Sequence, residues 1–192
     1  MQADWEFEVG GDAPVIDALW LGFVDLRAAR ERVRELPETS QCVGLATALE
    51  KLNSPRSPVW TCKCDFWPEL DAGEFDGDEL DSPAGECSSA TAVYIDMLPA
   101  ANGAWRLPQL AEAAARELYA RLAAVPLRCC RADLIIRRAV VALDATDFGI
   151  TAYLTACGAG AEDAARTLEA VLAEFGNSFF TGSTLQWKSA GE

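Results

Sequence analysis

The second half of the chain alternates the two hydrophobic periods of secondary structure in an order that few folds accommodate. Strand-like apolar patterns cover about 91–98, 130–143 and 148–157, and the last two are close enough in sequence to form a hairpin. Apolar residues at helical spacing cover about 108–125, opened by Pro108, and 162–175, followed by Gly176 as a C-terminal cap. A short last strand is predicted within 179–187. The resulting order is strand, helix, hairpin, helix, strand.

This order is that of a ferredoxin-like sandwich, β-α-β-β-α-β. We therefore expect an α+β fold in which an antiparallel sheet carries helices on one face and the C-terminal half is ferredoxin-like. The N-terminal half should add a hairpin of strands over 5–9 and 15–24, two helices and a strand. The helices are predicted over 25–36, ended by Pro37, and from Ser40 to 52, and the strand over 59–67.

The segment 69–86, called the acidic loop below, joins the two halves. It contains eight acidic residues, no basic residue and several Gly and Pro, which predicts a long loop without regular structure. A chain of 192 residues with 51% hydrophobic residues suits a single domain over 1–192, and the acidic loop is the only candidate for an internal boundary.

Charge and composition exclude several classes of function. The net charge of −14 disfavours nucleic acids and anionic membranes as partners, because phosphate groups require a basic surface. The absence of histidine removes Ser-His-Asp and Cys-His catalysis and every zinc site that needs an imidazole. Acidic residues stand near Met1 where a secretory signal would carry Lys or Arg, so we expect a cytoplasmic protein.

The seven cysteines are an odd number spread over predicted strands and helices, which favours free, mostly buried thiols. Cys62 and Cys64 have ligand-like spacing on one apolar strand face, but packing is the favoured interpretation over a metal site. The carboxylates of 76–81 lack the spacing of an EF-hand loop, and the glycines at 158 and 160 do not form a phosphate cradle. We expect no metal and no cofactor.

Strand alternation places polar side chains from several strands on the sheet face opposite the apolar residues. A solvated sheet face is the simplest interpretation, and a recognition surface is the functional one, since Tyr and Arg suit binding sites. Trp67 and Trp105 border loops and could anchor a partner. The face comprises Thr61, Lys63, Asp65, Tyr94, Asp96, Arg131, Asp133, Arg137, Thr151, Tyr153 and Thr155.

No motif is specific enough to name a family, so the function is ranked by class. A non-enzymatic protein-binding module that engages a basic partner comes first, with an immunity-type inhibitor as one example. Its predicted binding residues are Asp76, Asp78, Glu79 and Asp81 of the acidic loop together with Lys63, Asp65, Tyr94, Asp96, Arg131, Asp133 and Tyr153. The alternatives are a small enzyme or small-molecule binder that uses Asp65, Asp96, Lys63, Arg131 and Tyr153, and a homodimer that buries the same face.

Overall fold

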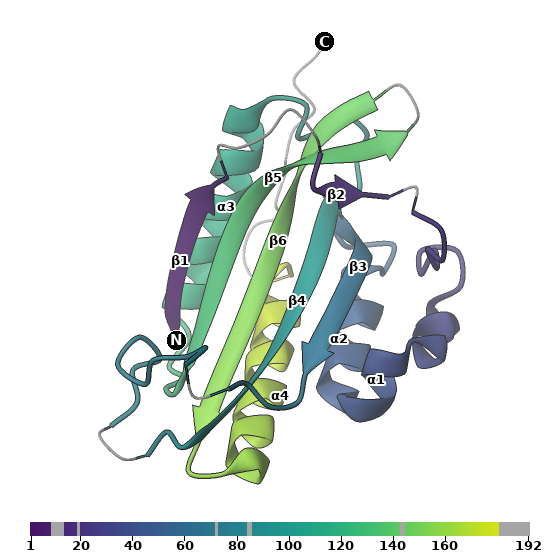
Figure 1. Ribbon diagram of the computed structural model, residues 1–192. Helices are drawn as coiled ribbons and strands as arrows, with labels where there is room; N and C mark the ends of the chain where they lie inside the picture. The colour runs from purple at the N-terminus through teal and green to yellow at the C-terminus, as the bar shows by residue number, and fades with distance from the viewer. Residues whose placement is uncertain (9–13, 19, 72, 84–85, 143–144, 181–192) are drawn as a thin grey trace.

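A mixed β-sheet forms one layer of the protein, and helices form the other (Figure 1). The computed structural model describes residues 1–8, 14–18, 20–71, 73–83, 86–142 and 145–180. Within these ranges the sheet has six strands in the order β1-β5-β6-β4-β3, with β2 also beside β5. The strands are β1 (Gln2–Phe7), β2 (Ile16–Asp17), β3 (Val59–Trp67), β4 (Ser89–Pro99), β5 (Cys130–Ala142) and β6 (Ala145–Gly158). The helices are a 3-10 helix (Arg30–Glu35), α1 (Pro37–Gln41), α2 (Val43–Leu52), α3 (Pro108–Ala123) and α4 (Ala161–Ser178).

The strand pairing confirms an α+β fold but corrects the expected sheet. β5 and β6 pair antiparallel, as do β6 with β4 and β4 with β3. β1 and β2 both run parallel to β5, so the sheet is mixed rather than antiparallel throughout. The predicted strand after α4 lies beyond Phe180, outside the described residues, and the ferredoxin-like order stays a prediction.

Helices α2, α3 and α4 lie behind the sheet and cover one of its faces (Figure 1). The predicted cap at Gly176 is wrong, because α4 continues through it to Ser178. A Cβ at Gly176 would lie 3.2 Å from Cδ of Lys51, and one at Gly44 would lie 3.3 Å from Cα of Glu169. Both glycines therefore serve the close packing of α2 against α4.

The N-terminal half departs most from expectation. The predicted hairpin is replaced by two parallel contacts with β5, and the proposed turn at 10–12 lies outside the described residues. Ile16 fills the space beside Gly149, where a Cβ would lie only 2.6 Å from Cδ1 of Ile16. Local sequence patterns do not reveal this contact, because the two residues are far apart in the chain. Asp25 binds Arg27 through both carboxylate oxygens instead of capping a long helix. Pro37 begins α1 at its first turn rather than ending a helix.

A β-bulge between Thr61 and Lys63 shifts the alternation of the side chains along β3 by one residue. Trp60 and Cys62 pack on the face away from the helices, against Ile16, Ala18 and Leu98. Thr61 faces the helices instead of the polar side, and Cys64 lies in the main core. The expectation that Cys62 and Cys64 share one strand face is therefore wrong.

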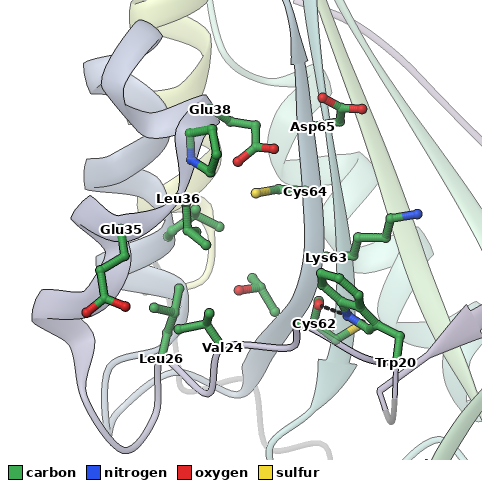
Figure 2. Close-up of a pocket in the computed structure, with 14 residues that line it drawn as sticks. Trp20, Val24, Leu26, Glu35, Leu36, Glu38, Cys62, Lys63, Cys64 and Asp65 are labelled. Carbon is green, nitrogen blue, oxygen red and sulfur yellow. Dashed lines mark hydrogen bonds between the residues drawn. The ribbon is translucent and has the colours of Figure 1, made fainter.

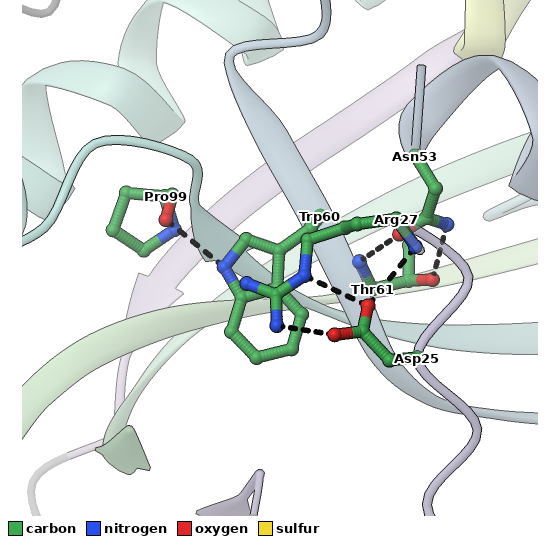
Figure 3. Close-up of polar contacts among 6 residues, drawn as sticks. All are labelled: Asp25, Arg27, Asn53, Trp60, Thr61 and Pro99. Atoms are coloured by element: carbon green, nitrogen blue, oxygen red, sulfur yellow. Dashed lines mark hydrogen bonds and ion pairs between the residues drawn. The ribbon is translucent and has the colours of Figure 1, made fainter. Parts of the chain in front are cut away.

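Asn53 links the end of α2 to this bulge (Figure 3). Its buried amide donates to the carbonyl of Leu49 at 2.9 Å and to Oγ1 of Thr61 at 2.7 Å, and its Oδ1 accepts the Thr61 N–H at 3.0 Å. Beside it, the guanidinium of Arg27 lies 3.8 Å from the ring centroid of Trp60, whose Nε1 donates to the Pro99 carbonyl. These side chains thus fix the N-terminal end of β3 at the edge of the sheet.

Candidate functional site

The face of the sheet that points toward the viewer in Figure 1 carries no helix of the described residues, and we call it the uncovered face. Ile16, Ala18 and Phe23 pack over one end of it, and Leu70, Phe75 and Leu80 of the acidic loop pack over the other. Between these two covers, the register lines up polar side chains in rows that cross the strands. All seven sheet residues predicted as partner-binding lie in three adjacent rows of this face.

The middle row, called the tyrosine row, crosses five strands. Asp65 of β3 is paired with Tyr94 of β4, and Tyr94 with Tyr153 of β6. Tyr153 is paired with Asp133 of β5, which in turn lies beside Asp4 of β1. Two tyrosines are therefore flanked on both sides by carboxylates.

The tyrosine row continues into an aromatic chain. The ring centroids of Tyr94 and Tyr153 are 5.8 Å apart, and those of Trp67 and Tyr94 are 5.7 Å apart. Nζ of Lys63 and the guanidinium of Arg137 each lie 5.8 Å from a tyrosine ring, those of Tyr94 and Tyr153 respectively. Cations thus already approach these rings within the protein. All three rings are half-buried, so part of each remains accessible.

A buried polar chain runs beside the tyrosines. Asp96 is 7% exposed, and its Oδ1 accepts a 2.5 Å hydrogen bond from Thr151. Arg137 donates to Thr151 at 3.2 Å and forms an ion pair with Glu8 of the segment after β1. Burial raises the pKa of Asp96, while the Thr151 hydrogen bond and the charges of Arg137 and Lys63 oppose that rise. This chain ties β4, β6 and β5 together below the aromatic rings.

A second charged group lies at the β1 side of the face. Arg131 donates to Asp133 at 2.7 Å and lies 3.5 Å from a carboxylate oxygen of Asp4. These residues line a pocket of about 330 Å³ together with Tyr153. Burial raises the pKa of Asp133, and the hydrogen bond and charge of Arg131 act against it. Both arginines of the face are therefore neutralised by carboxylates of the protein itself.

The acidic loop is held against the end of the sheet by apolar contacts. Leu80 is 3% exposed and packs with Ala90 and Cys157, although the sequence suggested only a solvated segment. Asp76 accepts the Asp78 N–H at 2.9 Å, and Asp81 lies 3.7 Å from Arg128. The charge of Glu79 reaches both Arg131 and Asp133. The four predicted loop carboxylates, Asp76, Asp78, Glu79 and Asp81, are exposed, and the loop that carries them packs on the end of the uncovered face through Leu80.

The described residues contain no group of three or more His, Cys, Asp or Glu side chains placed to hold a metal ion. The seven cysteines are free, and burial raises the pKa of Cys64 to about 12 and that of Cys130 to about 11. Such thiols are protonated at neutral pH and are poor nucleophiles. Trp105 is a buried core residue at 1% exposure, not the surface anchor that its position suggested.

Sequence reasoning missed the contribution of the first strand. Asp4 and Glu8 pair with Arg131 and Arg137 because β1 runs parallel to β5. The alternation of acidic and apolar residues over 4–8 indicated which side chains face outward, but not their neighbouring strand.

Comparisons with protein-family models, with curated proteins and with solved structures gave no match. Among the described helices, none combines the length and apolar character needed to cross a bilayer.

Proposed function

We propose that the protein is a non-enzymatic binding module that engages a basic protein partner through the uncovered face. The tyrosine row carries this proposal, because it presents two adjacent aromatic rings between carboxylates on a face that no described helix covers. Binding sites depend on such half-buried aromatic residues, whose rigid side chains lose little conformational freedom on association.

The charges of the row favour arginine as the partner's contact residue. A guanidinium can stack on a tyrosine ring while donating two hydrogen bonds to a carboxylate. Asp65 and Asp133 lie at the two ends of the tyrosine pair, within one strand spacing of the rings. An arginine side chain laid across Tyr94 or Tyr153 would therefore meet both an aromatic face and an acid.

The acidic loop contributes long-range attraction rather than a close fit. Its exposed carboxylates lie on a segment that packs on the end of the uncovered face, and charges at the rim of an interface mainly raise the association rate. An immunity-type inhibitor of a basic protein is one form of this proposal. The free thiols support a cytoplasmic location, and the antiparallel order β4-β6-β5 supports a ferredoxin-like C-terminal half, in which β3 takes the place beside β4 that the last strand of the sandwich would occupy.

A test of the proposal compares two labelled peptides of alternating Arg-Gly and Lys-Gly sequence with equal length and charge. We expect the arginine peptide to bind several-fold more tightly and to shift the amide NMR signals of Tyr94 and Tyr153. The double variant Tyr94→Leu/Tyr153→Leu should largely remove this preference, because the rings supply the flat surface on which a guanidinium stacks better than an ammonium group. The control Tyr119→Leu, on α3 in the other layer, should keep it. Equal affinities for both peptides, or shifts confined to the helices, would refute the proposal.

The second candidate is an enzyme or small-molecule binder that uses Asp96. The raised pKa of Asp96, beside Lys63 and Arg137, is the observation that favours it. Two observations oppose an enzymatic role: the Asp96 carboxylate is nearly inaccessible, and it already accepts a hydrogen bond from the Thr151 hydroxyl. If Asp65→Asn or Asp96→Asn abolished a measurable turnover while the fold remained intact, the enzyme would replace the binding module.

A further inference from the structure

A second concave site lies at the outer edge of the sheet, on the opposite side of β3 from the tyrosine row. It is a pocket of about 340 Å³ between β3 and the segment that leads into α1, and we call it the edge pocket. Figure 2 shows its two walls, with Leu26, Leu36 and Glu38 on one side and Lys63, Cys64 and Asp65 on the other. Its volume lies at the lower end of the roughly 300–1,000 Å³ typical of ligand sites, which suits one apolar side chain and its backbone.

The wall formed by β3 is the last strand of the sheet. Within the described residues β3 pairs only with β4, and alternate backbone groups of an edge strand point away from its neighbour. Side chains occupy part of this edge, since Trp20 Nε1 donates to the Cys62 carbonyl at 3.0 Å and Asn53 accepts the Thr61 N–H. Trp20, Thr61 and Cys62 themselves line the edge pocket together with Lys63, Cys64 and Asp65, and the Phe66 N–H donates to Oδ1 of Asp65 at 2.8 Å. The stretch of edge left to an added strand is therefore the short one from Lys63 to Asp65.

The charges around the edge pocket specify the partner. The lining of the pocket includes the apolar residues Leu26, Leu36 and Leu49. Its charged lining residues are Glu35, Glu38 and Asp65 and a single cation, Lys63. A second copy of this chain fits poorly, because each copy has a net charge of −14 and would bring acidic surface to an acidic rim.

We propose that the edge pocket binds an extended basic segment of a partner protein, which adds to β3 as a further strand and places one apolar side chain in the pocket. Main-chain hydrogen bonds to β3 supply affinity in this mode, and the pocket and rim supply specificity. The site shares Lys63 and Asp65 with the uncovered face but does not use the tyrosine rings, and it does not depend on the function proposed for that face.

The test uses a capped peptide, Lys-Val-Lys-Leu-Lys-Val-Lys, and two analogues that are N-methylated at either the odd or the even residues. An added strand bonds to β3 through alternate residues only, so one analogue should lose most of its affinity and the other should keep it. Amide NMR signals of Lys63 to Phe66 should shift. Equal binding of all three peptides would show attraction by charge alone and would overturn the proposal, as would shifts confined to Tyr94, Tyr153 and Asp133.

Variants separate this site from the one proposed above. Glu35→Gln/Glu38→Gln should weaken binding of the unmethylated peptide several-fold, whereas Glu31→Gln/Glu50→Gln, with the same charge change outside the pocket, should not. Tyr94→Leu/Tyr153→Leu should leave this binding unchanged, so failure at one site leaves the other testable. Unfolding curves of each variant verify that the fold is intact. Equal loss in both glutamate pairs would contradict the site, as would self-association of the protein in place of peptide binding.

Discussion

The rings of Tyr94 and Tyr153 lie 5.8 Å apart on neighbouring strands, and a carboxylate follows in register on each outer side, Asp65 next to Tyr94 and Asp133 next to Tyr153. Aromatic pairs across strands stabilise a sheet, so the contact alone has a structural use. Its position on the uncovered face, beside the exposed acidic loop, is the basis of the binding function that we propose.

Neutralising the acidic loop should slow association with a basic partner. The variant Asp76→Asn/Asp78→Asn/Glu79→Gln/Asp81→Asn removes charges from the rim, and Asn at position 81 tolerates the positive φ of 54° found there. With the arginine peptide as probe, we expect stopped-flow association several-fold slower at low salt and a smaller difference at high salt, where screening weakens long-range attraction.

A matched variant controls for net charge. Glu31→Gln/Glu50→Gln/Glu162→Gln/Glu169→Gln removes the same charge from exposed positions on the 3-10 helix, α2 and α4. Its association rate at low salt should fall less. An equal fall in both variants would exclude the acidic loop as the steering element.

Replacing Asp96 by Asn should stabilise the protein at neutral pH. Burial raises the pKa of Asp96 above that of the unfolded chain, so its contribution to stability is complete below the ordinary pKa of aspartate and is lost as pH rises through the folded value. The Asn variant keeps an acceptor for Thr151 and cannot ionise. We expect its unfolding free energy to exceed that of the parent by about 1 kcal/mol at pH 7, and by less near pH 4.

Urea unfolding at several pH values measures this difference. The control Glu50→Gln, at an exposed site on α2, should show no comparable trend. A loss of stability in Asp96→Asn at pH 7 would mean that the attraction of Arg137 and Lys63 outweighs desolvation.

Asn53 should be among the least replaceable polar residues. Asn53→Ala leaves the buried Thr61 N–H without its acceptor and removes the amide donor to Oγ1 of Thr61, whereas the Leu49 carbonyl still accepts the backbone N–H of residue 53. Each unsatisfied buried group costs about 1–3 kcal/mol, and we expect a decrease of this order in the free energy of unfolding. The exposed Asn102→Ala should change stability little, and chemical denaturation compares the two. Equal stabilities of Asn53→Ala and Asn102→Ala would contradict the role of Asn53 in joining α2 to β3.

Gly149 should not accept a methyl group. A Cβ there would lie 2.6 Å from Cδ1 of Ile16 and 2.9 Å from the Met97 carbonyl oxygen, which belongs to the backbone and cannot move aside. We expect Gly149→Ala to lose about 1–3 kcal/mol of stability. Gly73→Ala, whose Cβ would have nothing within 4 Å, is the control. A thermal shift that is the same in both variants would contradict the packing of Ile16 against β6.

The sequence predicts the second half of the fold well and the first half poorly, for physical reasons. β4 and α3 lie within a few residues of their predicted ranges, because long periodic patterns there agree with start signals such as Pro108. The predicted strand over 15–24 fails because only Ile16–Asp17 finds a place beside β5, a contact that depends on Gly149 more than a hundred residues away.

The site shows the same division. Alternation alone assigned Tyr94, Asp96 and Tyr153 to one side of the sheet, and the register agrees. It could not say that Asp65 and Asp133 would flank the tyrosines, since row neighbours depend on strand order. The edge pocket was invisible because it requires a short 3-10 helix where a helix over 25–36 was expected, and α1 across the break predicted between that helix and the one from Ser40 to 52.

The extra residue in β3 places two consecutive side chains, Cys62 and Lys63, on the same layer. The pairing passes directly from Thr61 opposite Met97 to Lys63 opposite Asp96, so deletion of Cys62 would leave a regular strand with Trp60, Lys63 and Asp65 still on the uncovered face. Deletion of a residue beyond the bulge, such as Cys64, would instead turn every side chain on one side of the deletion to the opposite layer. The strand can therefore lose a residue at the bulge without reversing its side chains, whereas a loss beyond the bulge exchanges the two layers.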